Sequence, residues 1–219
     1  SFLKKPFYGI NHLEGHALTM GLIKPLSFPF LLLLISGGHS QFLSVEGVGK
    51  YKRLGTTIDD ALGEAFDKTA KILGIEFPGG PKIESYAKKG NEKKFELPKP
   101  ILYKSGCNLS FAGLKTAILR ASKQIKSKKD KYDLAASFQK TVNQILEIKC
   151  QKAMDLFLER HKKIKNKNFI IAGGVASNLT IRKTIKKVSK IKNFNSYYPP
   201  LELCTDNAAM IAYAGILNH

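Results

Sequence analysis

The sequence predicts an α/β fold in which helices pack on a sheet that contains buried strands. Two apolar runs, 28–35 and 169–172, have the length and the continuous hydrophobicity of strands buried on both faces. The segments between them include amphipathic stretches, of which 133–161 is the longest. Strands that alternate with helices of this kind predict a layered α/β architecture.

Local patterns predict the other elements in chain order. Residues 6–10 have the character of a short strand, and the segment after them predicts a helix. Further strands are expected at 41–45, 51–54 and 194–198, and further helices at 61–73, at 82–89, from 111 onward, after 174, and from 204 to 217. Loops are expected at 88–100 and 123–131. Ser110 is the expected N-cap of the helix from 111, and Thr205 or Asp206 that of the last helix.

The composition is that of a globular protein, with 219 residues of which 43% are hydrophobic and 24% charged. Three widely separated cysteines, Cys107, Cys150 and Cys204, favour a reducing compartment over a disulfide framework. No apolar run has the length of a membrane span, and no signal peptide is evident. We therefore expect a cytoplasmic protein without a membrane partner.

The formal net charge of +19 is concentrated in one part of the chain. Residues 115–192 contain 21 basic and 5 acidic residues. Such a surface attracts polyanions, above all nucleic acid. Only four of the basic residues are arginines, however, and an excess of lysine can also reflect genome composition. Charge alone therefore leaves a nucleic-acid partner and a merely solvated surface both open.

His12 and His16 are the first candidate site. Residues four apart lie on one face of a helix, where two imidazoles can share a metal ion. The alternative is a pair of partly buried histidines held by backbone hydrogen bonds. Glu14 is expected on another face. Asp206, at the start of the last helix, is the best candidate for a third, oxygen ligand.

Glycine pairs and one acidic row give further candidates. Gly37-Gly38 predicts a hairpin turn, and Gly173-Gly174 follows a buried strand and precedes a helix, a junction that can hold a nucleotide. Asn178 could contact a sugar or base, or cap that helix. In the row Asp60, Glu64 and Asp67, the last carboxylate could accept hydrogen bonds from a ribose.

Seven motifs occur in order along nearly the whole chain. They are Asn11-His12-x-x-Gly15-His16, Ser36-Gly37-Gly38-His39-Ser40-Gln41, Asp59-Asp60-Ala61-x-Gly63-Glu64-Ala65-Phe66-Asp67-Lys68, Pro78-Gly79-Gly80-Pro81, Phe111-x-Gly113-Leu114-Lys115, Ala172-Gly173-Gly174-Val175-x-x-Asn178 and Cys204-Thr205-Asp206-Asn207. Together they resemble the tRNA threonylcarbamoyladenosine transferase family (TsaD, formerly called Gcp or O-sialoglycoprotein endopeptidase).

The resemblance implies an ASKHA fold, the two-lobe architecture of actin and sugar kinases. It implies an acyltransferase that moves a threonylcarbamoyl group from threonylcarbamoyl-adenylate to the N6 amine of the adenosine beside the anticodon, in tRNAs that read codons beginning with A. One divalent metal ion per subunit, Fe²⁺, would be held by His12, His16 and Asp206, with no catalytic residue beyond this metal site. The residues expected to bind the acyl-adenylate are Leu34, Ile35, Ser36, Gly37, Gly38, Asp67, Gly80, Glu84 and Asn178.

The resemblance also implies context beyond this chain. Residues 1–219 would form a single region, mainly the second lobe, because family members carry a longer N-terminal part that includes most of the first lobe. Partners would be tRNA, a paralogous TsaB-type subunit and a small TsaE-type P-loop ATPase. Many members carry Asp where this chain has Glu84.

Three alternative functions would need other features. A metalloprotease-like hydrolase of the zincin type would need Glu directly after the first histidine, where this chain has Leu13. An ASKHA sugar kinase would need a first-lobe phosphate loop and a catalytic acid. An inactive scaffold paralogue would generally lack the three metal-ligand residues, which this chain keeps.

Overall fold

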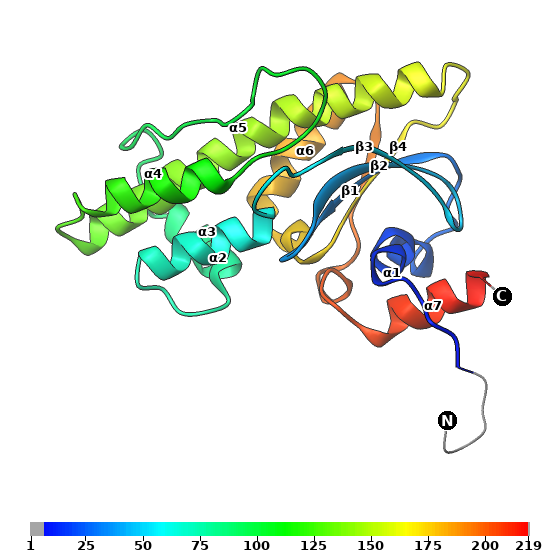
Figure 1. The fold of residues 1–219 in the computed structure, drawn as a ribbon, viewed down its shortest axis with the longest axis horizontal. Coiled ribbons are helices and arrows are strands. Elements are labelled where there is room, and N and C mark those ends of the chain that lie inside the picture. The colour runs from blue at the N-terminus through cyan, green and yellow to red at the C-terminus, as the bar shows by residue number, and fades with distance from the viewer. Residues whose placement is uncertain (1–6, 219) are drawn as a thin grey trace.

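The structure is a computed structural model that describes residues 7–218. Five strands form one mixed sheet in the order β3-β2-β1-β4-β5 (Figure 1). Strands β1, β2 and β3 are antiparallel neighbours, β4 runs parallel to β1, and β5 runs parallel to β4. The strands are β1 (Phe30–Ile35), β2 (Ser40–Gly47), β3 (Lys50–Thr56), β4 (Asn168–Ala172) and β5 (Asn195–Tyr197). The predicted α/β class is confirmed.

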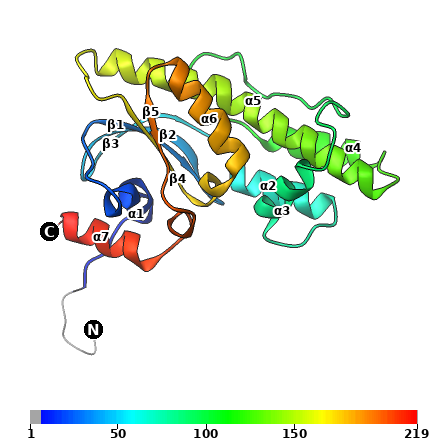
Figure 2. The ribbon, with the colours of Figure 1, turned by 180° about the vertical axis from the view of Figure 1, so that it is seen from behind.

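Helices cover the two faces of this sheet unequally. Helix α1 lies on one face with α7 packed beside it, and the long α5 and α6 lie on the other (Figures 1 and 2). The helices are α1 (His12–Leu18), α2 (Leu62–Ile72), α3 (Gly79–Ala87), α4 (Ala112–Ser122), α5 (Lys128–Arg160), α6 (Leu179–Ile191) and α7 (Ala208–Asn218). None of the described helices is long and apolar enough to cross a membrane.

Strand β1 is the centre of the core. All six of its residues are buried, as the apolar run predicted. Leu31, Leu33 and Ile35 pack into the large cluster formed with α2–α6, while Phe30, Leu32 and Leu34 pack into a smaller cluster with α1. The alternation of side chains along the strand thus joins the two layers, and the ends of β1 and β4 lie side by side.

Several predicted boundaries are wrong for identifiable reasons. Residues 7–10 of the strand predicted at 6–10 form no strand, and residue 6 lies outside the described residues. Helix α3 begins at Gly79, so the Pro78–Pro81 segment starts a helix rather than preceding one. Proline is tolerated in the first turn because its missing N–H has no partner there.

Predicted caps are also replaced by side chains from elsewhere. Asp59 accepts hydrogen bonds from the backbone of Phe111 and Ala112, and Ser110 donates to Asp59 instead of capping α4. Asn207 caps α7 by accepting from the Met210 N–H at 2.9 Å, so neither Thr205 nor Asp206 is needed for this. These changes leave Asp206 free for another role.

Candidate metal centre and adjoining cavity

Helix α1 presents both histidines toward the last part of the chain. Asn11 caps the helix by accepting from the N–H groups of Leu13 and Glu14, at 2.9 and 3.3 Å. Glu14 points elsewhere, as predicted, and accepts from the Gly49 N–H and the Tyr51 hydroxyl at 2.8 and 2.7 Å. These contacts fix the rotation of α1, so that His12 and His16 share the opposite face.

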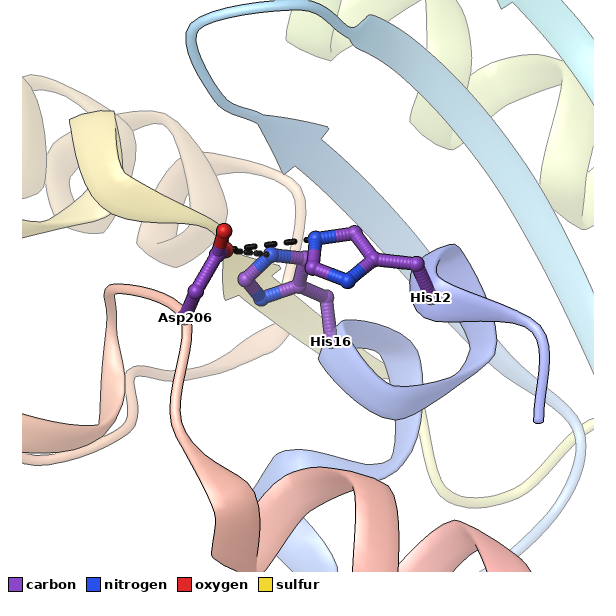
Figure 3. Close-up of side chains that lie close together, drawn as sticks. All are labelled: His12, His16 and Asp206. Atoms are coloured by element: carbon purple, nitrogen blue, oxygen red, sulfur yellow. Dashed lines mark hydrogen bonds and ion pairs between the residues drawn. The ribbon is translucent and has the colours of Figure 1, made fainter. Parts of the chain in front are cut away.

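His12, His16 and Asp206 converge, although 190 residues separate His16 from Asp206 (Figure 3). Asp206 Oδ1 lies 3.2 Å from His12 Nε2 and 3.1 Å from His16 Nε2. The possible ligand atoms of the three residues all lie within 4.8 Å of one another. Two metal–ligand bonds of about 2.1 Å that meet at roughly 90–110° place their ligand atoms about 3.0–3.4 Å apart. The two distances to Asp206 fall in this range, which makes the three side chains candidate ligands of a single ion.

The surroundings of the cluster keep it suited to a cation. Burial lowers the pKa of the His16 imidazole, the nearby His12 lowers it further, and Asp206 opposes both effects. A neutral imidazole is the form that binds metal. His16 is 2% exposed, whereas His12 is 50% and Asp206 76% exposed. One side of the cluster is thus open, which leaves coordination positions for a substrate.

Close packing of α1 on α7 brings the two parts of the cluster together. A Cβ atom at Gly15 would lie 3.0 Å from Ile211 Cδ1 and 3.3 Å from Met210 Cγ. The glycine between the two histidines therefore lets α7 approach α1 closely. Because Asp206 lies just before α7, its position depends on this approach.

A cavity of about 500 Å³ is lined by Thr205, the residue that directly precedes Asp206. Its walls come from the turn after β1, from α2, from the start of α3 and from the segment between β4 and α6. Of the nine residues predicted to bind the acyl-adenylate, five line this cavity: Gly37, Asp67, Gly80, Glu84 and Asn178. Residues far apart in sequence thus meet around one cavity, and Thr205 links its lining to the neighbouring Asp206.

The other four predicted residues do not line this cavity. The side chains of Leu34 and Ile35 are completely buried in β1. Ser36 and Gly38 belong to the turn between β1 and β2, where the Ser36 N–H donates to the His39 carbonyl at 2.7 Å. In this turn only Gly37 reaches the cavity wall.

The polar residues of the cavity wall also hold its elements in place. Asp67 Oδ1 accepts from the Gly79 N–H at 2.8 Å, which ties α2 to the start of α3. Glu84 Oε1 accepts from both the backbone N–H and the hydroxyl of Thr180 at 2.9 Å, at the start of α6. The longer side chain at position 84 therefore reaches the neighbouring helix.

Asn178 resolves one alternative from the sequence, because it does cap α6. Its Oδ1 accepts from the Ile181 N–H at 2.9 Å, and its Nδ2 donates to Gln139 Oε1 at 2.9 Å. It also lines the cavity. Any role in ligand contact would come in addition to this capping.

Gly63 is required where α2 approaches the turn after β1. Its N–H donates to the Ser36 carbonyl at 3.1 Å, and a Cβ atom there would lie only 2.6 Å from the same oxygen. Backbone on backbone leaves no room for a side chain. The cavity wall on this side is therefore set by a glycine that sequence reasoning cited only within a motif.

Sequence reasoning missed several apolar parts of the wall. Phe77 lines the cavity with its side chain 81% exposed, and Leu179 lines it from the first position of α6. Arg182 was also missed: it donates to the carbonyls of Ala176 and Pro199, at 2.5 and 2.9 Å, and so joins the wall to the segment that leads to Asp206. The only signal in the sequence was an aromatic residue, Phe77, directly before Pro78.

A family model described as TsaD, tRNA N6-adenosine threonylcarbamoyltransferase, matches residues 2–213. The chain belongs to the TsaD family. A relative of that name from Pelagibacter ubique is 63% identical over 216 residues, and one from Rickettsia rickettsii is 53% identical over 218 residues. These matches cover 99% of this chain but only 60% and 63% of the two relatives, so the chain spans about three fifths of their length.

Solved structures support the fold at low sequence identity. The full-length HypF crystal structure in its phosphate- and nucleotide-bound form has a TM-score of 0.65 at 14% identity, covering 99% of this chain and 37% of that one. The HypF structure from T. kodakarensis has a TM-score of 0.64 at 18% identity, covering 98% and 37%. The likeness confirms the ASKHA fold class for this TsaD-family chain.

Proposed function

We propose that this chain carries the metal- and donor-binding part of a tRNA N6-adenosine threonylcarbamoyltransferase, and that residues 1–219 act as one structural region. The observation that carries the proposal is the convergence of His12, His16 and Asp206, together with a cavity that Thr205 lines from the position before Asp206. Family membership supports the reaction class.

His12, His16 and Asp206 would hold one divalent ion, for which we propose Fe²⁺. Two imidazole nitrogens and one carboxylate with open positions beside them form a ligand set that suits Fe²⁺. When bound, such an ion supplies Lewis-acid chemistry beside the carbamoyl group. The chain's own contribution is to favour the neutral form of His16, because burial lowers its pKa, and to leave one side of the cluster open.

The cavity residues would bind and orient threonylcarbamoyl-adenylate. Asp67 Oδ1 is engaged by Gly79, so its other oxygen can accept from a ribose hydroxyl. Phe66, Phe77 and Val175 give the wall its apolar character, which suits an adenine ring. In this segment only Gly37 lines the cavity. We propose that its neighbours contribute through their backbone, which sets the position of Gly37; these are Leu34, Ile35, Ser36 and Gly38.

The proposed reaction needs positioning more than a protein nucleophile. The N6 amine of the acceptor adenosine attacks the carbamoyl carbonyl carbon and forms the new C–N bond. The C–O bond to the phosphate breaks, AMP leaves with the electron pair, and the amine loses a proton to solvent. Because the acyl-adenylate is already activated, holding both reactants in contact supplies much of the rate enhancement.

Partners beyond tRNA follow from the same proposal. A TsaB-type subunit and a TsaE-type P-loop ATPase would work with the longer protein in the cytoplasm. No described residue is assigned to their interfaces.

The metalloprotease-like alternative is not favoured by the geometry. Zincins need a glutamate beside the metal as general base. Here Glu14 accepts from Gly49 and Tyr51 on another face of α1, so it cannot serve the two histidines. An inactive scaffold would have no reason to keep His12, His16 and Asp206 in contact.

The test uses a chimera in which these 219 residues replace the matching segment of the Pelagibacter ubique relative. With tRNA, threonylcarbamoyl-adenylate and the partner subunits, we expect the modified nucleoside by mass spectrometry, and its loss after chelation. Asp206→Asn should reduce both metal content and product by about tenfold or more. Glu202→Gln, an exposed acid nearby, is the matched control and should change neither.

Two results would contradict the proposal. A metal-loaded Asp206→Asn protein with full activity would overturn the ligand assignment. Intact metal without product, in the presence of all partners, would favour the scaffold reading.

A further inference from the structure

The outer face of α6 combines a strong positive charge with a fixed position beside the cavity. The thirteen residues of α6 include Arg182 and four lysines, and no acidic residue. The lysines are Lys183, Lys186, Lys187 and Lys190, all exposed. At 100° per residue they fall within one face of about 100°, opposite the buried Ile181, Ile185 and Val188.

Most of these lysines form no ion pair within the described residues, so their charges can attract an anionic ligand. Among the described residues, only Lys187 of the four has an acidic partner, with Glu147 at 3.6 Å. By contrast, α5 carries five acidic residues among its basic ones. The α6 lysine face, as we call Lys183, Lys186, Lys187 and Lys190, is therefore a local concentration of positive charge rather than part of a mixed surface.

The same face begins at the cavity. Leu179 lies four residues before Lys183 on this side of the helix, lines the cavity and is 52% exposed. From Leu179 to Lys190 the helix rises about 16 Å. A ligand that follows the α6 lysine face toward the start of the helix thus arrives at the rim of the cavity.

The position of α6 is rigidly fixed to the cavity wall. Asn178 caps it, Glu84 holds Thr180, and Arg182 is bound to the carbonyls of Ala176 and Pro199. Figure 2 shows α6 in front of α5, with its first turn near α2 and α3. The lysines and the cavity therefore keep a constant spacing, which a ligand that touches both would need.

Further lysines continue beyond the end of α6. The Asn195 N–H donates to the Lys167 carbonyl at 2.8 Å, which places the segment before β4 beside the segment after α6. Lys162, Lys163 and Lys165 in that segment are exposed. The positive surface thus extends away from the cavity for longer than one helix.

From these observations we propose that the α6 lysine face binds the phosphate backbone of the acceptor RNA and guides the reacting nucleotide to the cavity. The proposal rests on the proposed function, which requires an RNA acceptor. Phosphates repeat along the strand on both sides of the reacting base, so a row of cations that ends at the rim matches such a ligand. Lysines serve here as backbone contacts, which do not depend on base sequence.

The test measures tRNA binding by the chain, using an unmodified tRNA transcript over roughly 50–200 mM salt. The variant is Lys183→Gln, Lys186→Gln and Lys190→Gln together. The control removes the same charge at Lys123, Lys126 and Lys128, which are exposed around the α4–α5 connection, at the end of α5 remote from Arg160 (Figure 1).

We expect the α6 variant to bind tRNA about tenfold or more weakly, with the slope of log affinity against log salt reduced by about two. The control should lose less than about threefold. AMP binding and the circular dichroism spectrum should be unchanged in both variants, because neither set of lysines lines the cavity.

Equal losses in both variants, or no tRNA binding by the unsubstituted chain, would overturn the proposal. So would binding of the same lysines to anionic vesicles without tRNA binding. Transfer by the chimera is read separately. If the unsubstituted chimera forms product and the α6 variant binds tRNA like the control, the proposed surface is wrong and the proposed function stands. If the unsubstituted chimera forms no product while the α6 variant alone has a reduced salt slope, the surface stands and the proposed function is wrong.

Discussion

At the scale of single residues, the site depends on atoms that no local pattern describes. The pair His12 and His16 is visible in the sequence, but Asp206 reaches it only because α7 packs closely against Gly15. Similarly, Gly63 matters because a backbone carbonyl occupies the place where a Cβ atom would lie. Small residues here determine distances between chain segments rather than local conformation.

One prediction follows for Gly63. Gly63→Ala should lower the free energy of unfolding by about 1–3 kcal/mol, because the new Cβ atom forces α2 away from the Ser36 carbonyl. Denaturant unfolding measures this, and AMP affinity should fall as well because Gly63 lines the cavity. Gly80→Ala is the control for stability: its Cβ atom would meet nothing within 4 Å in a helix, so we expect no loss.

At the scale of elements, long helices are held by polar side chains that reach across from loops and neighbouring helices. Asp59 caps α4, and Glu84 contacts the start of α6. The buried Asp133 of α5 accepts from the Asn91 N–H at 2.7 Å and pairs with Lys129. The hydrogen bond between Asn91 and Asp133 thus attaches the polar loop at 88–100 to α5.

Asp133 gives a pH-dependent prediction. The Lys129 ammonium holds the pKa of this carboxyl below its usual range, helped by the Asn91 N–H and opposed by burial. Since the pKa is depressed in the folded state, its stabilisation is present above the unfolded pKa of about 3.9 and is lost as the pH falls through the folded value. Unfolding of the native chain and of Asp133→Asn, measured from neutral pH to about pH 2, should differ at neutral pH and converge in acid. A difference that persists unchanged at the lowest pH would contradict this.

At the scale of the whole molecule, the sheet separates a large core cluster from a small one, and the candidate site forms where the ends of β1 and β4 meet loops from both sides. The metal candidates come from α1 and the segment before α7, whereas most of the cavity wall comes from α2, α3 and the start of α6. Stability of the large core therefore affects the cavity more directly than it affects the metal cluster.

Phe138 tests this coupling. It is completely buried and packs edge to face on the cavity residue Phe66, with ring centroids 5.0 Å apart. Phe138→Ala should cost about 3–5 kcal/mol of unfolding free energy and weaken AMP binding. Metal content should change much less, since His12 and His16 lie on α1, which packs on the other face of the sheet. Loss of metal in parallel with AMP affinity would show that the two parts are not separable in this way.

Much of the architecture follows from local sequence. The continuous apolar runs that become β1 and β4, the glycine turn before β2 and the amphipathic pattern of α5 are decided by hydrophobic periodicity and turn chemistry, which act over a few residues. The described part of the predicted first strand, residues 7–10, shows the limit of this reasoning. An apolar stretch becomes a strand only if a neighbouring strand pairs with it, and none does there.

By itself, the sequence determined the α/β class, the histidine pair on one helix face, the ordered motifs and the concentration of charge between residues 115 and 192. The tertiary structure decided which residues meet: Asp206 with His12 and His16, five of nine predicted donor-binding residues around one cavity, and Leu179 at the start of the α6 lysine face. The reason is physical. Spacing along the chain fixes which side chains share a face of one element, but contacts between elements depend on how closely whole surfaces pack, and at Gly15 and Gly63 that closeness is set by the absence of a side chain.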